Sequence, residues 1–253
     1  IYAILRVYPL VFGDEAGELA NLGMDWLFPI ALATLAMGVI GALGSGSLKT
    51  LVAWQVIISV GTLLAPISLG SEAGLSAALF YMLSTTWTVG GLFLVSELIA
   101  NQRGSANDRI ITAPRMHNRT FLSVLFLIGA VAAAGLPPLS GFIGKLLILQ
   151  SVEPGFEMAW LWSVLLVGSF LTIIAYSRAG SIVFWRTVDG HLEKPDPLNG
   201  RISVAAGALT ALAIVLVVFA GPITRYTDAT AEQLHNNNAY IEILQMPMVG
   251  EDD

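Results

Sequence analysis

The chain has 253 residues, of which 55% are hydrophobic and only 12% are charged, with a formal net charge of −6. A soluble domain carries roughly 25% charged residues, and the apolar residues here form runs of about 20, the length that crosses a bilayer. The composition therefore excludes a soluble enzyme, and the negative charge excludes a nucleic-acid-binding module. Because the chain has no cysteine, it is not a disulfide-stapled secreted domain. We predict an all-α, polytopic helical membrane protein.

The first predicted element, residues 1–12, is an apolar run that a helix would extend over only about 18 Å, too short to span a membrane. It lacks both the basic start and the small-residue cleavage site of a signal peptide. We expect residues 1–12 to be the end of a transmembrane helix that begins upstream.

Six transmembrane helices are predicted within residues 13–223, joined by short segments rich in Gly, Pro, Ser and charge. They cover residues 24–43, 51–69, 75–100, 121–152, 159–185 and 202–223. Residues 224–253 form a C-terminal tail, in which residues 229–244 have the pattern of an amphipathic helix. We expect this stretch to lie along the membrane surface or a partner; the alternative is a frayed terminus.

The orientation of the chain follows from its basic residues. Alternate loops contain none, whereas the loops on the other side contain eight: Lys49, Arg103, Arg109, Arg115, Arg119, Arg186, Lys194 and Arg201. The tail adds only Arg225. Since cytoplasmic loops carry the excess of Lys and Arg, we expect these loops in the cytoplasm and residues 224–253 outside.

The predicted span 121–152 contains a break. A continuous helix of that length would measure about 48 Å, against a hydrocarbon core of about 30 Å. In its middle, Pro137 and Pro138 remove two backbone donors and clash with the preceding turn. Such breaks persist only inside protein or beside a wet cavity, and in transporters they mark ion or substrate sites. The predicted break comprises Gly135, Pro137, Pro138, Ser140 and Gly141.

Lys145 follows this break and is the only lysine within a predicted span. The second half-helix begins near Ser140, so we expect its positive end close to the ammonium. That dipole and the low dielectric both oppose the charged form, and a lysine that loses and regains its proton is a relay element. The alternative is a lysine that snorkels or is structurally paired.

Weaker polar signals lie in other spans. The hydroxyls of Ser84, Thr85 and Thr88 form a cluster that either carries protons with water or only tightens helix packing. Gln55 and Ser59 share a helix face and are possible supporting groups. Arg178 is another, although a structural role close to the cytoplasmic end is favoured for it.

Other kinds of site are not expected. The three histidines, His117, His191 and His235, are too scattered for a metal site, and no nucleophile–base pair indicates catalysis. We therefore expect no metal, no cofactor and no catalytic residue.

The motif Gly135-Leu-Pro-Pro-Leu-Ser-Gly-Phe-Ile-Gly-Lys145 resembles the broken helix of the antiporter-like subunits. These occur in Mrp-type multisubunit Na⁺/H⁺ antiporters and in the membrane arm of respiratory complex I. Three further segments resemble the Mrp D subunit specifically: Ile1-Tyr-Ala-Ile-Leu-Arg-Val-Tyr8, Ala78-Leu-Phe-Tyr81 with Gly91-Leu-Phe-Leu94, and Ala231-Glu-Gln-Leu with Ala239-Tyr-Ile241.

The resemblance implies an antiporter-like fold of fourteen helices in two inverted repeats, of which this chain is the C-terminal part. It places Lys145 at the family's lysine in the twelfth helix. Many relatives have a histidine in the eleventh helix, where this chain aligns Ser84 and Val89. A relay there would run through water held by Ser84, Thr85 and Thr88.

The function that we predict is a subunit of a monovalent cation (Na⁺)/proton antiporter in a bacterial cell membrane. It would carry protons through a buried polar axis that uses Lys145, as a transporter component and not an enzyme. Expected partners are subunits of the Mrp A, B, C, E, F and G types, protons, monovalent cations and the lipid bilayer, but no nucleic acid. The alternatives are a proton-pumping membrane subunit of a respiratory NADH:quinone oxidoreductase-like complex, and a scaffold that only holds other subunits.

Overall fold

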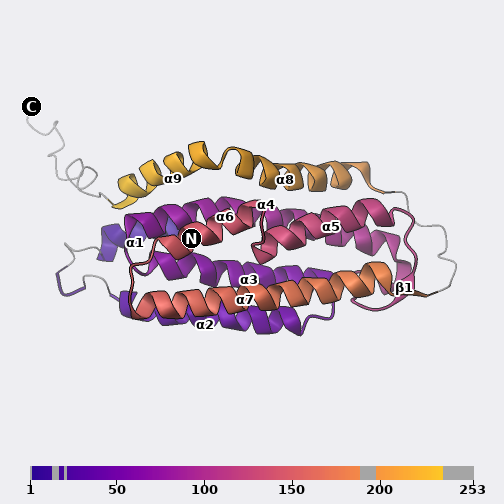
Figure 1. Ribbon diagram of the computed structural model, residues 1–253, viewed down its shortest axis with the longest axis horizontal. Helices are drawn as coiled ribbons and strands as arrows, with labels where there is room; N and C mark the ends of the chain where they lie inside the picture. The colour runs from indigo at the N-terminus through magenta and orange to yellow at the C-terminus, as the bar shows by residue number, and fades with distance from the viewer. Residues whose placement is uncertain (1, 13–16, 20–21, 189–197, 236–253) are drawn as a thin grey trace, which may run out of the picture.

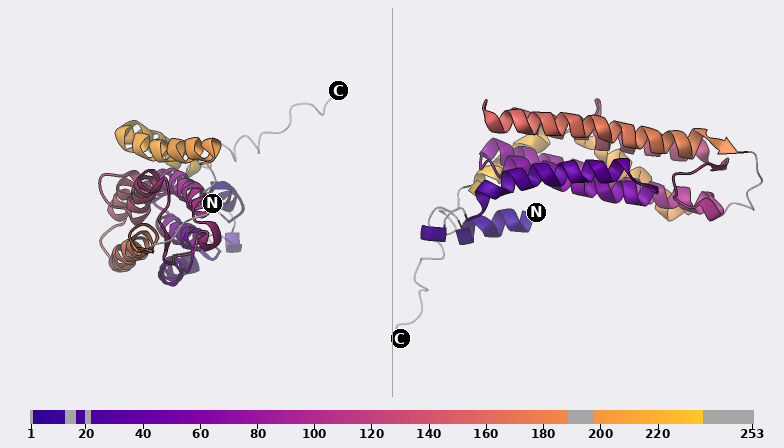
Figure 2. Two further views of the ribbon diagram at one scale, coloured as in Figure 1. Left: turned by 90° about the vertical axis from the view of Figure 1, so that its right-hand side faces the viewer. Right: turned by 90° about the horizontal axis from the view of Figure 1, so that it is seen from below.

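The protein is a bundle of long helices that run close to one common axis (Figure 1). The computed structural model describes residues 2–12, 17–19, 22–188 and 198–235. Seen along the axis, α8 and α9 lie along one side of the other helices (Figure 2). The helices are α1 (Tyr2–Phe12), α2 (Met24–Leu43), α3 (Leu48–Ile67), α4 (Glu72–Gln102), α5 (Arg119–Ala134), α6 (Ser140–Gln150), α7 (Phe156–Gly180), α8 (Gly200–Val218) and α9 (Ala220–His235).

Short elements lie between the helices. Two are single 3₁₀ turns at Gly17–Leu19 and Gly104–Ala106, and a π-helical turn, Ser181–Trp185, continues α7. The two-residue strands β1 (Ala113–Pro114) and β2 (Thr187–Val188) pair in parallel. Their pairing ties the connection before α5 to the segment after α7.

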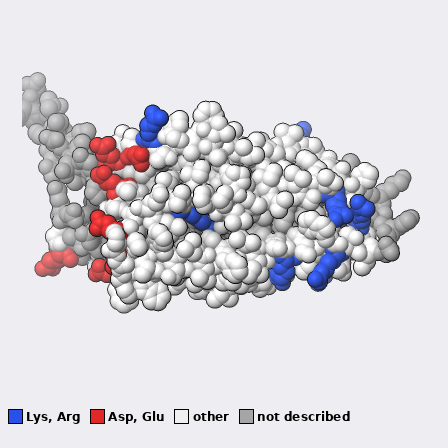
Figure 3. Space-filling model, viewed as in Figure 1, with Lys and Arg blue, Asp and Glu red and all other residues white. Residues whose placement is uncertain are grey.

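Several helices of the described residues match what a membrane requires. Helices α2, α3, α4, α8 and the segment Phe156–Trp185 are long and apolar enough to cross one, whereas α5 and α6 are apolar but shorter. On the face shown in Figure 3, acidic side chains gather at one end of the bundle and most Lys and Arg at the opposite end, and the wide belt between them is uncharged except for one blue patch near its middle.

Side-chain caps explain where three helices begin. Ser47 precedes α3 and accepts a hydrogen bond from the Thr50 amide at 3.2 Å. Ser71 accepts one from the Gly74 amide at 3.0 Å, so α4 begins at Glu72, three residues before the predicted span. Asn199 caps α8 in the same way. Each cap satisfies an amide that has no partner within the helix.

Glycines bring α2 and α3 into close contact. A Cβ atom on Gly61 would lie 2.5 Å from the Leu35 amide nitrogen, and one on Gly38 would lie 2.8 Å from that of Ile58. Only glycine permits this approach at both positions. Small residues have this role between membrane helices, where association depends on packing because lipid is as apolar as the side chains.

One predicted span was placed incorrectly. Residues 202–223 were expected to form a single helix, but α8 ends at Val218 and α9 begins at Ala220, with a visible bend between them (Figure 1). Pro222 lies in the first turn of α9. Proline there has no amide to donate to Val218, and its ring would clash with that carbonyl in a continuous helix. The helix therefore breaks at Phe219.

The amphipathic stretch predicted at residues 229–244 also differs from expectation in its described part. It belongs to α9, which packs against α4 of the same chain and whose Ala231 and Leu234 side chains are buried. The Ser76 hydroxyl of α4 donates to the Asp228 carboxylate at 2.5 Å and shares a 3.0 Å hydrogen bond with Thr227. Residues 236–253 lie outside the described residues.

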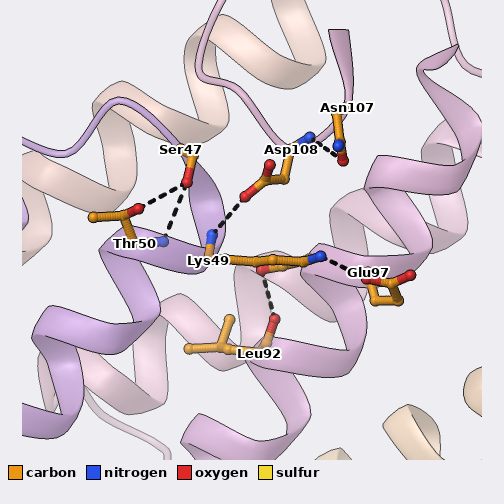
Figure 4. A network of polar contacts seen from close by, with 8 residues as sticks. Ser47, Lys49, Thr50, Leu92, Glu97, Asn107 and Asp108 are labelled. Atoms are coloured by element: carbon orange, nitrogen blue, oxygen red, sulfur yellow. Dashed lines mark hydrogen bonds and ion pairs between the residues drawn. The ribbon is translucent and has the colours of Figure 1, made fainter. Parts of the chain in front are cut away.

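At the basic end of the bundle, polar contacts hold the connection after α4 against the start of α3 (Figure 4). Lys49 forms a 2.7 Å ion pair with Glu97, and its backbone amide donates to the Asp108 carboxylate at 3.1 Å. The Asp108 carbonyl accepts from the Leu48 amide at 2.8 Å. A carboxylate beside the first amides of a helix is favourably placed in the field of the helix.

Arg103, one of the eight basic residues of the loops expected in the cytoplasm, is only 1% exposed. Its guanidinium donates to the carbonyls of Asn107, Arg109 and Ile111, because the loop that follows α4 folds back over it. Burial lowers the pKa of Arg103 from its ordinary value. This arginine fixes the loop, and Asp108 with it.

Candidate functional site at the helix break

The predicted break separates α5 from α6. Gly135 ends α5 in the left-handed conformation, with φ 79°, which glycine adopts without a Cβ penalty. The amides of Gly135 and Leu136 return to the Val131 carbonyl at 3.1 and 3.0 Å, a helix-ending pattern that satisfies otherwise unpaired carbonyls. Pro137 and Pro138, joined by a cis bond, then separate α5 from Ser140, the first residue of α6.

Gly135 and Gly141 make room for the break and for the lysine beside it. A Cβ atom on Gly141 would overlap the Ala132 carbonyl oxygen, so the first turn of α6 lies directly against the last turn of α5. A Cβ atom on Gly135 would lie 2.6 Å from Cδ of Lys145. Both glycines are needed for a lysine side chain to fold back onto the end of α5.

Lys145 is 6% exposed and is held by neutral oxygens. Its Nζ donates to the carbonyl of Ala134 at 2.9 Å, to the hydroxyl of Ser169 at 2.9 Å and to the carbonyl of Ala133 at 3.4 Å. No carboxylate is among these contacts in the described part of the chain.

This arrangement corrects one expectation. The ammonium was predicted to lie near the positive start of α6, but it contacts the last carbonyls of α5, which form the negative end of a helix. Side chains in a helix point toward its N-terminus, so Lys145 reaches back past the start of α6 to α5. The carbonyls favour the charged form, in opposition to the low dielectric.

Gln55 of α3 joins the same carbonyls. It is 1% exposed, and its Nε2 donates to the Ala133 carbonyl at 3.4 Å, so Gln55 and Lys145 share one acceptor. Its Oε1 has no hydrogen-bond partner among the described residues. The Ser59 hydroxyl donates to the Gln55 carbonyl at 2.9 Å and shares a 2.5 Å hydrogen bond with Thr85. Gln55 therefore lies beside the lysine, and Ser59 is linked to the site only through Gln55 and Thr85.

The three hydroxyl residues of the cluster predicted on α4 have different environments. Ser84 donates to Ser140 at 2.8 Å, at the first residue of α6, and both residues are buried. Thr85 pairs with Ser59. Thr88 is buried, and its hydroxyl has no partner among the described residues. It lines a small, mostly apolar cavity between α4, α5 and α8. Ser84 thus connects α4 to the break, and Thr85 connects α4 to α3. Thr88 makes neither connection.

Arg178 lies away from this site. Its Nη2 donates to the Ser45 carbonyl in the α2–α3 turn at 2.8 Å, and none of its contacts in the described chain includes Lys145. The contact satisfies a carbonyl just after the end of α2, which agrees with the structural role that its position favoured.

Sequence reasoning missed Ser169, which supplies the one side-chain acceptor of Lys145 among the described contacts. Its signal was weak, because Ser169 is one of several hydroxyl residues on the otherwise apolar α7 and nothing in the sequence distinguishes it from the others. Tyr176, two turns further along α7, was also missed; its buried hydroxyl has no partner among the described residues. Nothing in the sequence pairs either residue with the break.

Residues 1–175 match the protein family described as "NADH:quinone oxidoreductase/Mrp antiporter, TM". The chain belongs to this family. The match includes the helix break, Lys145 and Ser169, and the Mrp and complex I resemblance predicted from the sequence is confirmed. As a member of the family, the chain is a multi-pass helical membrane protein.

The similar curated proteins are of two kinds, antiporter D subunits and oxidoreductase N subunits. The chain is 33% identical to the D subunit of the probable K⁺/H⁺ antiporter of Rhizobium meliloti, over 99% of this chain and 51% of that protein. It is 29% identical to the D subunit of the Na⁺/H⁺ antiporter of Bacillus subtilis, over 96% and 48%. It is 28% identical to the N subunit of the NADH-quinone oxidoreductase of Thiobacillus denitrificans, over 81% and 42%. The chain thus spans about half the length of the curated relatives it matches.

Solved structures share the fold. One is a chain of the Mrp complex from Dietzia sp. DQ12-45-1b, with a TM-score of 0.78 and 20% identity, over 95% of this chain and 52% of that one. Another belongs to respiratory complex I from Thermus thermophilus, with a TM-score of 0.75 and 23% identity, over 92% and 48%. At these identities the likeness concerns the fold alone.

Proposed function

We propose that this chain is part of the D subunit of a multisubunit antiporter that exchanges a monovalent cation for protons. The antiporter D subunits of Rhizobium meliloti and Bacillus subtilis match 96% or more of this chain, whereas the N subunit of the Thiobacillus denitrificans oxidoreductase matches 81%. The greater coverage favours the antiporter. One of these antiporter relatives is named for K⁺ and the other for Na⁺, and we propose Na⁺ as the first cation to test.

Lys145 is the proton-relay residue in this proposal, and its contacts are the observation that carries it. A buried ammonium costs several kcal/mol, on the order of 3 at the centre of a membrane. Within the described part of the chain it is held only by carbonyl and hydroxyl oxygens, which remain neutral when the lysine loses its proton. If a lysine paired with a buried carboxylate lost its proton, the carboxylate would be left without a compensating charge. Neutral partners therefore suit a lysine that gives up and regains a proton.

The polar groups around Lys145 offer a path for the proton. Toward α4, Ser140 at the break is hydrogen-bonded to Ser84. Toward α3, the shared Ala133 carbonyl leads to Gln55, and the Ser59–Thr85 pair follows. We propose that these groups, with Thr88 as a more distant member, hold the water that carries protons across the bundle. Arg178 has a structural role in this scheme.

The membrane arrangement that we propose has six transmembrane helices within residues 13–223, the fourth broken and the last ending at the bend before α9. The basic end of the bundle faces the cytoplasm, and the acidic end with residues 224–253 lies outside, in a bacterial cell membrane. The fold would be the second of two inverted repeats. Subunits of the Mrp A, B, C, E, F and G types are the proposed partners.

The test is to replace Lys145 with methionine in the full antiporter complex and to measure sodium-dependent dissipation of a proton gradient in vesicles. Positioned proton-transfer groups contribute on the order of 100-fold or more to rates, so we expect exchange to fall by about that factor. Lys49→Met is the matched control, since Lys49 is an exposed lysine on α3. Undiminished exchange by an assembled Lys145→Met complex contradicts the relay.

The second candidate is a proton-pumping subunit of a respiratory complex, favoured by the matches to the oxidoreductase N subunit and to complex I. Purification of the complex that contains this chain separates the two candidates. Iron–sulfur and flavin absorbance would indicate the respiratory complex. A scaffold role, the third candidate, would leave exchange unchanged when Lys145, Ser84 and Gln55 are replaced one at a time.

A further inference from the structure

We infer that the oxygens that hold the Lys145 ammonium form a binding site for the transported monovalent cation, and that cation and ammonium occupy it in turn. The oxygens that contact the ammonium are the carbonyls of Ala133 and Ala134 and the hydroxyl of Ser169. Together with Oε1 of Gln55, which lies on the same side chain that contacts Ala133, they form what we call the oxygen cage. The inference rests on the proposed function, because cation exchange is what gives a buried cation site a role.

The first observation is the backbone. The chain breaks at Gly135, so the carbonyls of Ala133 and Ala134 lack the amides that a continuous α5 would supply four residues on. Both point at a positive charge, with Nζ of Lys145 at 3.4 and 2.9 Å. The C-terminal ends of half-helices and unwound carbonyls coordinate Na⁺ in other transporter folds. An ammonium group is thus bound where a cation would be.

The second observation is the amide of Gln55, which is almost completely buried. Its Nε2 contacts the Ala133 carbonyl, and Oε1, bonded to the same carbon, has no partner in the described chain. An unpaired buried acceptor costs free energy. A half-turn of the amide about the last side-chain bond brings Oε1 to the cage and turns Nε2 away. Gln55 therefore donates to the carbonyl while the ammonium is present and supplies an oxygen when a cation replaces it.

The third observation is the charge of the cage, which selects the class of ion. Its ligands are all neutral, and no carboxylate contacts Lys145 or Gln55 among the described residues. Proteins bind Ca²⁺ and Mg²⁺ with carboxylates, whereas rings of carbonyl and hydroxyl oxygens suit monovalent cations. Two positive charges within one such cage would repel each other strongly at low dielectric. Mutual exclusion of cation and ammonium couples the two ions.

The experiment measures equilibrium binding of radioactive sodium, and separately of rubidium as a stand-in for potassium, to the purified full complex. Removal of the ammonium by Lys145→Met opens the cage, and we expect the complex to bind one further cation, at least about tenfold more tightly than the wild type does. No added binding in an assembled Lys145→Met complex overturns the inference.

Further variants in the Lys145→Met background assign the added binding to the cage. Gln55→Glu, which keeps the shape of the side chain, should tighten it about tenfold by placing a negative charge beside the cation. Ser169→Ala should weaken it about three- to tenfold through loss of one oxygen. Ser163→Ala is the matched control: it lies on the same helix, and its exposed hydroxyl bonds only to the Ala159 carbonyl among the described contacts.

Binding that is equal in the Ser169→Ala and Ser163→Ala complexes, or that Gln55→Glu leaves unchanged, also overturns the cage. A merely structural role for Gln55 would make the glutamate weaken binding or assembly instead. The relay is judged separately: if Lys145→Met abolishes exchange without added cation binding, Lys145 remains the relay and the cage is wrong. If exchange persists, the relay is wrong and binding alone decides the cage.

Discussion

Lys145 and Lys49 both lie on helices of this protein, but they differ in exposure and in the kind of group that they contact. Lys49 lies in the first turn of α3 with a side chain 45% exposed, and its partner is a carboxylate, Glu97, at 2.7 Å. Lys145 is 6% exposed, and its partners are two carbonyls and a hydroxyl. Water solvates both charges of the Lys49–Glu97 pair and screens their attraction, so the pair contributes little to stability. Lys145 has partners that tolerate the loss of its charge.

The contrast shows which charged group of a membrane protein suits transport. A fixed ion pair such as Lys49–Glu97 ties two helices together at the surface. A charge held by the end of a broken helix is balanced by dipoles, so its removal leaves no opposite charge behind. The broken helix α5–α6 provides such dipoles inside the bundle. Within an intact helix the carbonyls cannot do this, because they already accept from amides four residues further on.

Among substitutions that distinguish the Lys145 site from the Lys49–Glu97 pair, Gly135→Ala is expected to have the largest effect on stability and exchange. An L-residue at φ 79° is strained by about 1–2 kcal/mol, and the new Cβ would press on Cδ of Lys145, adding roughly 1–3 kcal/mol of overpacking. The midpoint of thermal unfolding of the purified complex should fall, and the rate of exchange in vesicles should fall with it.

Gly70→Ala is the control for that change. Gly70 has a similar φ of 67° but nothing within 4 Å of a new Cβ, so it should show the strain alone and keep normal exchange. If the two variants behave alike, Lys145 does not depend on the space that Gly135 leaves.

A smaller effect is expected from Ser84→Ala, which removes the hydrogen bond to Ser140 at the break. A buried hydrogen bond contributes about 1 kcal/mol, and exchange should slow about fivefold while the complex stays assembled. Thr86→Ala provides the comparison, because Thr86 lies on the same helix but its exposed hydroxyl bonds to the Met82 carbonyl. Vesicle exchange rates for the two variants test whether the route through α4 is used; equal rates exclude it.

The smallest effect is expected from Lys49→Met. Exposed ion pairs contribute roughly 0–1 kcal/mol, and their contribution falls as salt is added. The midpoint of thermal unfolding should therefore drop only slightly at low salt and not at high salt, with exchange unchanged. A loss of exchange comparable to that of Lys145→Met would end the distinction between the two lysines.

The helix break was accessible to prediction because it is a local property. Two adjacent prolines stop a helix in any surroundings, and the glycine before them ends it in a conformation that other residues resist. Pro222 is the same kind of local signal, but the apolar run continues past it to residue 223 and therefore predicts one longer span.

The sequence by itself determined the class of the protein, the broken helix and the presence of one lysine beside it, since each depends on runs of apolar residues or on neighbouring residues. Only the tertiary structure decided what that lysine contacts. Ser169 is 24 residues from Lys145, and Gln55 is 78 residues from the carbonyl that it shares with the lysine. Such pairings depend on how helices pack, and in this apolar bundle packing is set by small residues and shape. The ammonium was predicted beside the start of α6 but contacts the end of α5, because the way in which the two half-helices pack decides which helix end the lysine side chain reaches.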